Sequence, residues 1–110
     1  MQPTYQNPVH GNVFADPFVL RHEGVYYAYG TAPGAPDGSQ IPVLRSTDLV
    51  AWVPLGHALA AGGDTHYWAP EVAERDGRFY MYYSSGSAPE GVDQRLRVAL
   101  ADHPAGPFVD

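Results

Sequence analysis

The sequence predicts an all-β fold, and three observations support this prediction. Helical periodicity is nearly absent, short runs rich in Val, Tyr, Phe and Leu recur, and clusters of Gly, Pro, Asp and Ser separate these runs. Apolar residues make up 45% of the chain, which favours a folded protein over a disordered one. A length of 110 residues fits one small domain with a modest core.

Eight short strands account for the apolar runs. The expected strands cover residues 18–22, 25–31, 41–46 and 52–55 in the first half, and residues 71–74, 79–84, 95–101 and 108–109 in the second half. Glu23-Gly24 and Asp76-Gly77 are predicted to form two-residue hairpin turns, because glycine supplies the positive φ angle that such turns require.

The two halves of the chain resemble each other. Pro17 and Pro70 each precede a short strand that ends in an acidic residue and then Gly24 or Gly77, and both pairs are separated by the same distance (70 − 17 = 53; 77 − 24 = 53). Paired aromatic residues follow each turn at the same offset. Four strands per repeat at this period are typical of β-propeller blades. The alternative is a β-sandwich that contains two coincidentally similar hairpins.

The predicted fold is therefore an all-β partial β-propeller of two four-stranded antiparallel blades. Blade I is expected at about residues 14–56 and blade II at about residues 66–110. Repeats of this kind bury their faces against neighbours, and two blades leave apolar faces and sheet edges uncovered. We therefore expect either the N-terminal part of a longer propeller or self-association through the exposed blade faces. The abrupt end at Asp110 favours the first possibility.

Charge and composition exclude several function classes. The formal net charge is −6, with 12 acidic residues against 6 basic residues, and this balance argues against a nucleic-acid partner or an anionic membrane surface. The absence of cysteine excludes disulfides, and the five histidines show no metal-type spacing, so no metal and no cofactor are expected. The N-terminus lacks signal-peptide features, and no apolar run approaches the ~20 residues of a membrane helix. A cytoplasmic location is the expectation.

Asp16 is the candidate catalytic residue. It is a lone acid at the mouth of a predicted strand, where an ionised carboxylate aimed into a cleft can activate water. Pro17 disfavours helical angles for the preceding residue, so an extended backbone is expected to fix the direction of Asp16. The alternative is an ordinary turn aspartate before a strand.

Four further residues are candidates for substrate binding. Trp68 offers a flat apolar face on which a sugar ring can stack, although blade packing explains it almost as well. Glu71 can accept hydrogen bonds from sugar hydroxyls, or it is a solvated acid at a strand end. His66 and Asn7 are placed near the same cleft, with a surface loop and a simple turn as their respective alternatives.

Several segments together resemble known glycosidases. In order along the chain, the segments are Asn7-Pro8-Val9, Phe14-Ala15-Asp16-Pro17, Gly24-Val25-Tyr26-Tyr27 with Gly30-Thr31, Ser46-Thr47-Asp48-Leu49 with Trp52, Trp68-Ala69-Pro70-Glu71, Gly77-Arg78-Phe79-Tyr80-Met81-Tyr82-Tyr83-Ser84 and Gly106-Pro107-Phe108. Their order and spacing resemble the first two blades of a family 43 glycoside hydrolase. The resemblance covers almost the whole chain.

The resemblance implies a five-bladed β-propeller that hydrolyses arabinose- or xylose-containing oligo- or polysaccharides with inversion at the anomeric carbon. It identifies Asp16 with the catalytic base of the family and places the other two family acids beyond Asp110. Whether this chain is itself an enzyme therefore stays open, and the isolated chain is expected to be inactive. The alternative is a non-catalytic carbohydrate-binding or structural half-propeller that needs assembly.

Overall fold

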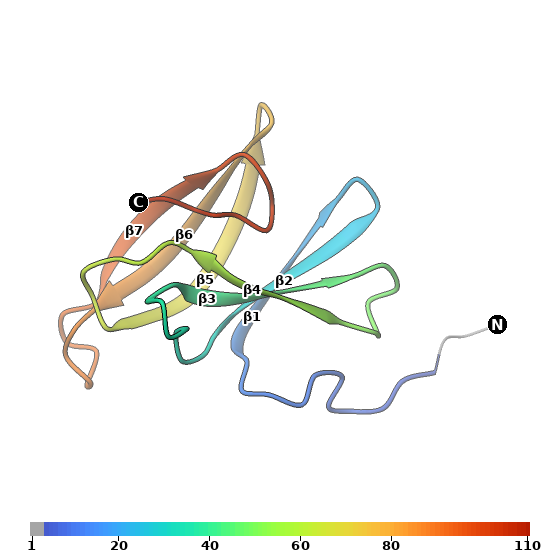
Figure 1. The fold of residues 1–110 in the computed structure, drawn as a ribbon, viewed down its shortest axis with the longest axis horizontal. Coiled ribbons are helices and arrows are strands. Elements are labelled where there is room, and N and C mark those ends of the chain that lie inside the picture. The colour runs from blue at the N-terminus through green and yellow to red at the C-terminus, as the bar shows by residue number, and fades with distance from the viewer. Residues whose placement is uncertain (1–3) are drawn as a thin grey trace.

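The protein consists of two antiparallel β-sheets (Figure 1). The structure, a computed structural model, describes residues 4–110, and within them it contains seven strands and no helix. Each sheet keeps its strands in sequence order. The first sheet contains β1 (Ala15–His22), β2 (Val25–Thr31), β3 (Gln40–Ser46) and β4 (Val53–Leu59), and the second contains β5 (His66–Arg75), β6 (Arg78–Gly86) and β7 (Arg95–Ala101).

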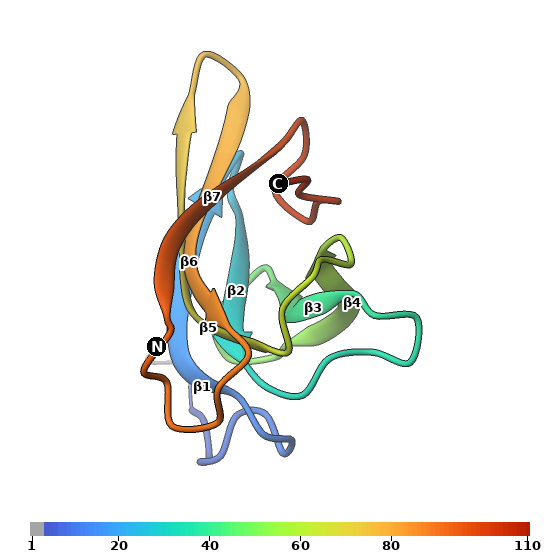
Figure 2. The ribbon, with the colours of Figure 1, turned by 90° about the vertical axis from the view of Figure 1, so that its left-hand side faces the viewer.

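The hydrophobic core lies between the two sheets. Strand β5 contacts β1, β2 and β3, and Figure 2 shows the β1–β2 hairpin standing beside β5 and β6. Alternate residues of β6 face this core, as Phe79, Met81 and Tyr83 are buried whereas Tyr82 between them is exposed. Large aromatic side chains dominate the energetics of such a core because each one removes a large apolar area from water. The all-β prediction is confirmed.

Both predicted hairpin turns are confirmed. His22 pairs with Val25 across the first turn, and Arg75 pairs with Arg78 across the second. Both residues of each turn have positive φ angles, 51° and 77° in the first turn and 53° and 77° in the second. This is the backbone shape that matches the twist of the flanking strands. The sequence repeat is therefore also a repeat in backbone geometry.

The C-terminal segment connects the two sheets. The N–H of Phe108 donates to the carbonyl of Ala58 in β4 at 2.7 Å, and its own carbonyl accepts from the N–H of Ala60 at 2.9 Å. The next residue, Val109, exchanges two hydrogen bonds with Leu100 in β7 at 2.9 and 3.0 Å. The last strand of blade II, expected over residues 108–109, is thus a pair of isolated bridges, because its two residues pair with different sheets.

Candidate functional site

The candidate site begins with two equivalent β-bulges. Pairing of β1 with β2 shifts register between Ala15 and Phe18, and pairing of β5 with β6 shifts between Trp68 and Glu71. Each bulge takes two residues, an Asp-Pro or an Ala-Pro pair, out of the regular ladder. A bulge re-aims the side chains it contains, and bulges are frequent beside functional sites.

The expected extended backbone at Asp16 is wrong. Asp16 has a φ angle of 48°, in the left-handed region, and Ala69 in the second bulge has a φ angle of 53°. Pro17 biases Asp16 toward extended angles, and the bulge overrides this bias. Aspartate enters the left-handed region more readily than most residues. The bulge, not an extended strand, therefore sets the direction of the Asp16 side chain.

A hydroxyl group of the neighbouring strand joins the two bulges. Thr31, the last residue of β2, donates from Oγ1 to Oδ2 of Asp16 at 3.0 Å. The same Oγ1 accepts a hydrogen bond from the backbone N–H of Ala69 at 2.8 Å. One side chain thus contacts the carboxylate in the first sheet and the backbone of the second sheet.

Asp16 and Glu71 line one pocket where the two sheets meet. The pocket has a volume of about 370 Å³, within the range of small-ligand sites. Both carboxylates are exposed to solvent. Ionised carboxylates act solely as hydrogen-bond acceptors, so the pocket suits a ligand that carries many hydroxyl donors. The lining residues are Asp16, Pro17, Phe18, Ala69, Pro70 and Glu71.

Trp68 and His66 lie together at the start of β5. Their rings make an edge-to-face contact with centroids 6.0 Å apart, and both side chains are partly buried. The indole also faces Gly91, where a β-carbon would come within 2.7 Å of Trp68 Cζ3. Because Gly91 has a φ angle of 78° and no side chain, the loop can pack against the indole. Neither Trp68 nor His66 lines the pocket of Asp16 and Glu71.

The loop that covers Trp68 is held by Asp93. The carboxylate of Asp93 accepts hydrogen bonds from the backbone N–H groups of Ser87 at 2.8 Å and Ala88 at 3.1 Å. The backbone hydrogen bond from Ser87 is the main cause that holds the pKa of Asp93 below its ordinary value. The loop between β6 and β7 is therefore ordered by a charged group of its own.

Asn7 lies outside the pocket of Asp16, whereas Thr31 contacts Asp16 directly. Asn7 is exposed in the segment before β1 and does not line the pocket of Asp16. Thr31 contacts Asp16, although the sequence interpretation gave it no role. Counting back along both strands from the Glu23-Gly24 turn brings residue 31 opposite residue 16, and the bulge moves the actual partner of Thr31 by one residue, to Ala15.

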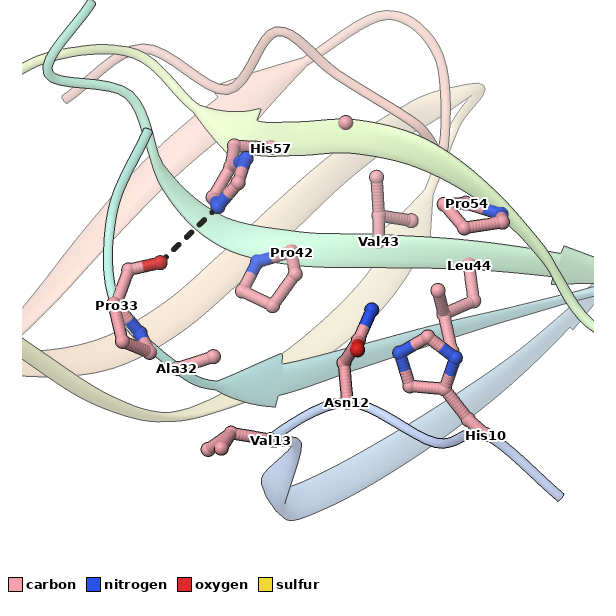
Figure 3. Close-up of a pocket in the computed structure, with 11 residues that line it drawn as sticks. His10, Asn12, Val13, Ala32, Pro33, Pro42, Val43, Leu44, Pro54 and His57 are labelled. Atoms are coloured by element: carbon pink, nitrogen blue, oxygen red, sulfur yellow. Dashed lines mark hydrogen bonds between the residues drawn. The ribbon is translucent and has the colours of Figure 1, made fainter. Parts of the chain in front are cut away.

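A second pocket lies against β3 and β4 of the first sheet (Figure 3). It has a volume of about 420 Å³ and is lined largely by proline and aliphatic side chains. His10 and Asn12 of the N-terminal segment border it, and His57 of β4 lies with Nε2 3.2 Å from the carbonyl oxygen of Pro33. None of the five predicted site residues lines this pocket.

The described part of the chain has neither a metal-type side-chain cluster nor a helix that could span a membrane. Within residues 4–110, no cluster of three or more His, Asp or Glu side chains is arranged to hold a metal ion. The same residues include no helix of the length and apolar character needed to cross a membrane.

Comparison with known proteins gives a consistent picture. The family profile described as "Glycosyl hydrolases family 43" matches residues 5–110. An extracellular exo-alpha-(1->5)-L-arabinofuranosidase of Streptomyces avermitilis is 35% identical over 95 residues, which cover 79% of this chain and 19% of that protein. A non-reducing end alpha-L-arabinofuranosidase of Bacteroides ovatus is 30% identical over 128 residues, covering 99% of this chain and 22% of that protein.

The fold is also found in solved structures. A thermostable family-43 glycoside hydrolase superimposes with a TM-score of 0.76 and 39% sequence identity, over 96% of this chain and 35% of the other. The chain spans about a fifth of the length of the two curated relatives.

Proposed function

Since the chain belongs to glycosyl hydrolases family 43, we propose that it forms the first part of the catalytic domain of an inverting glycoside hydrolase. The proposed substrates are arabinose- or xylose-containing glycans. The arabinofuranosidases among its relatives support arabinose as the sugar. In this proposal residues 1–110 supply the first two blades of a five-bladed propeller.

Asp16 is the catalytic base in this proposal. The observation that carries it is the solvent-exposed carboxylate held by Thr31 at the mouth of a pocket between the sheets. Inversion requires one carboxylate to activate a water molecule on one face of the sugar while an acid protonates the leaving oxygen on the other. An exposed and oriented carboxylate is suited to the first of these tasks.

Glu71 shares the pocket but has a different role in the proposal. It accepts hydrogen bonds from sugar hydroxyls, while the acid that protonates the leaving group is supplied by sequence after Asp110. Canonical inverting enzymes separate the two catalytic carboxyl groups by about 6.5–9.5 Å. Because the acid lies outside these 110 residues in this proposal, we expect the isolated chain to bind sugar weakly and to show no hydrolysis.

The remaining binding residues are proposed with defined roles. Trp68 offers the free part of its indole to a sugar ring, and His66 supports the orientation of that indole through their edge-to-face contact. Asn7 is proposed to contact a more distant sugar unit, since it is exposed and lies outside the pocket lining.

We propose that the protein is located where its polymeric substrate is found. The sequence by itself favours the cytoplasm, whereas the Streptomyces avermitilis relative is named an extracellular enzyme. Polymeric arabinan or xylan is met outside the cell, so we propose that the protein acts there. Cell fractionation with an antibody against the chain tests this proposal.

The experiment that tests the proposed function is Asp16→Asn in the full-length protein. This change keeps the shape of the side chain but removes the base, and we expect hydrolysis of arabinan and of aryl arabinofuranosides to fall by about 10²–10⁴-fold. Binding of arabino-oligosaccharides, measured by calorimetry, is expected to persist. Glu90→Gln, a change of the same kind at an exposed loop residue, is the control.

Two results would contradict the proposal. Undiminished turnover by Asp16→Asn removes Asp16 from the mechanism. Sugar binding by the unmodified full-length protein without any hydrolysis favours the second function class, a non-catalytic carbohydrate-binding or structural half-propeller.

A further inference from the structure

We propose that Thr31 is a positioning residue that orients the Asp16 carboxylate by anchoring it to the backbone of the second sheet. This inference rests on the proposed role of Asp16 as the base. Thr31 belongs to the first sheet, and its proposed role depends on its contact with the second sheet.

The direction of the Thr31 hydroxyl follows from the donors and acceptors around it. The backbone N–H of Ala69 can only donate, so Thr31 Oγ1 must use a lone pair to accept at 2.8 Å. Its own proton is then free, and the acceptor within reach is Oδ2 of Asp16 at 3.0 Å. An ionised carboxylate accepts and does not donate. All three groups are therefore satisfied in one arrangement.

The arrangement also holds the second bulge. Ala69 has a φ angle of 53°, an uncommon conformation for a residue with a β-carbon. The hydrogen bond to Thr31 fixes this backbone, and Ala69 and Glu71 lie on the same pocket as Asp16. Thr31 thereby fixes the position of Asp16 relative to Ala69 and Glu71 in the pocket.

The internal repeat provides a comparison within the chain. Ser84 of β6 is the counterpart of Thr31, since each pairs with the residue just before its bulge (Thr31 with Ala15 and Ser84 with Trp68). The position equivalent to Asp16 is Ala69, which has no carboxylate, and the Ser84 hydroxyl lies 3.5 Å from the carbonyl of Trp68. The repeat by itself thus does not require the contact of hydroxyl and carboxylate seen at Thr31.

The expected consequence for catalysis is that the Asp16 carboxylate is held in the orientation that the reaction needs. A base that is displaced by about 1 Å loses on the order of 10²-fold in rate, because the reacting atoms leave the productive geometry. Loss of one of the contacts that hold Asp16 should therefore lower kcat. It should leave substrate affinity almost unchanged, because Thr31 is not among the residues that line the pocket.

The test compares three variants of the full-length protein with arabinan as substrate. Thr31→Val keeps the shape but removes the hydroxyl, and we expect kcat to fall by roughly 10–100-fold with KM changed by less than about 3-fold. Thr31→Ser restores the hydroxyl and is expected to stay within about 3-fold of the unmodified protein. Ser84→Ala removes one hydroxyl from the equivalent position of the second repeat and serves as the matched control.

A second readout does not depend on activity. Hydrogen exchange, followed by mass spectrometry on a peptide covering residues 66–72, should be faster in Thr31→Val, because the Ala69 N–H has lost its acceptor. Thr31→Ser and Ser84→Ala should keep the unmodified rate. A melting curve for each variant shows whether global unfolding accounts for any difference.

The inference is overturned if Thr31→Val keeps full kcat while Asp16→Asn is inactive, or if Thr31→Ser is as impaired as Thr31→Val. Unchanged exchange of the peptide in Thr31→Val overturns it as well. If Asp16→Asn itself retains turnover, the proposed function fails first, and the two failures are thereby distinguished.

Discussion

At the scale of single residues, Tyr29 shows how one polar group holds two distant parts of the chain. Its hydroxyl is buried and donates to the carbonyl oxygen of Pro104 at 2.5 Å. Burial raises the pKa of Tyr29 well above its ordinary value, so the hydroxyl keeps its proton and remains a donor. The segment that follows Pro104 carries the bridges between the sheets.

The first prediction concerns this contact. Tyr29→Phe leaves the Pro104 carbonyl buried without its donor, and we expect the free energy of unfolding to fall by about 1–3 kcal/mol. Urea denaturation at equal protein concentration measures the change. Tyr5→Phe is the control, because Tyr5 is 66% exposed and should shift stability by less than about 0.5 kcal/mol. Equal stabilities for the two variants would contradict the account.

The sequence predicted Asp16 as the candidate base but did not predict how its side chain is held. That prediction rests on the place of Asp16 before a strand and on the family resemblance. Its left-handed backbone was not predicted, because the rule for residues before proline favours extended angles and does not take the β-bulge into account. Thr31 lay within reach of register counting, whereas its bond to Ala69 depends on inter-sheet packing that no local pattern encodes.

At the scale of elements, aspartate carboxylates that accept backbone hydrogen bonds hold the loops in their observed conformation. Asp48 accepts hydrogen bonds from the N–H groups of Val50 and Ala51 at 2.9 Å each, and Asp93 holds the β6–β7 loop in the same way. The backbone hydrogen bond from Ala51 is the main cause of the lowered pKa of Asp48. A carboxylate with a lowered pKa stabilises the fold while it is ionised.

The second prediction is a loss of stability in acid. Because the folded-state pKa values of Asp48 and Asp93 lie below the ordinary 3.8, their contribution is complete above that pH and is lost as the pH falls through the folded values. We expect the melting temperature to fall as the pH is lowered below about 3.8. Asp93→Asn should lessen this acid dependence, and Glu90→Gln in the same loop should not. A melting temperature that stays constant below pH 3.8 would refute the prediction.

The strands were largely predictable, and the exceptions have physical causes. The prediction began β5 at residue 71, directly after Pro70. The strand instead begins at His66, since the bulge removes Pro70 from the ladder and pairing resumes on its other side. The strand expected over residues 108–109 failed for a different reason, as its partners belong to two sheets.

At the scale of the whole molecule, the two sheets leave one broad face uncovered. Paired residues of β6 and β7 point away from the core, and among them Tyr82, Leu96 and Val98 are exposed by 45%, 77% and 36%. The radius of gyration is 14.1 Å, slightly above the ~13 Å of a compact domain of about this length. The exposed side chains fit a second sheet that keeps one face free for a further neighbour.

The third prediction is that the isolated 110-residue chain self-associates through this face. Sedimentation velocity over a wide range of concentration should show growth of the mean mass. Leu96→Glu places a charge on the face and should reduce association. Val92→Glu is the matched control, because Val92 is 78% exposed but lies in the β6–β7 loop. A single monomeric species at every concentration would contradict this prediction.

The most direct measurement is a crystal structure of the full-length Asp16→Asn protein with a bound arabino-oligosaccharide. Our account predicts a sugar ring in the pocket between the two bulges, with one of its hydroxyls donating to Glu71 and its anomeric carbon facing position 16. Thr31 should still bridge position 16 and the Ala69 backbone. A sugar seated instead against His10 and His57, with the pocket between the bulges empty, would contradict the account.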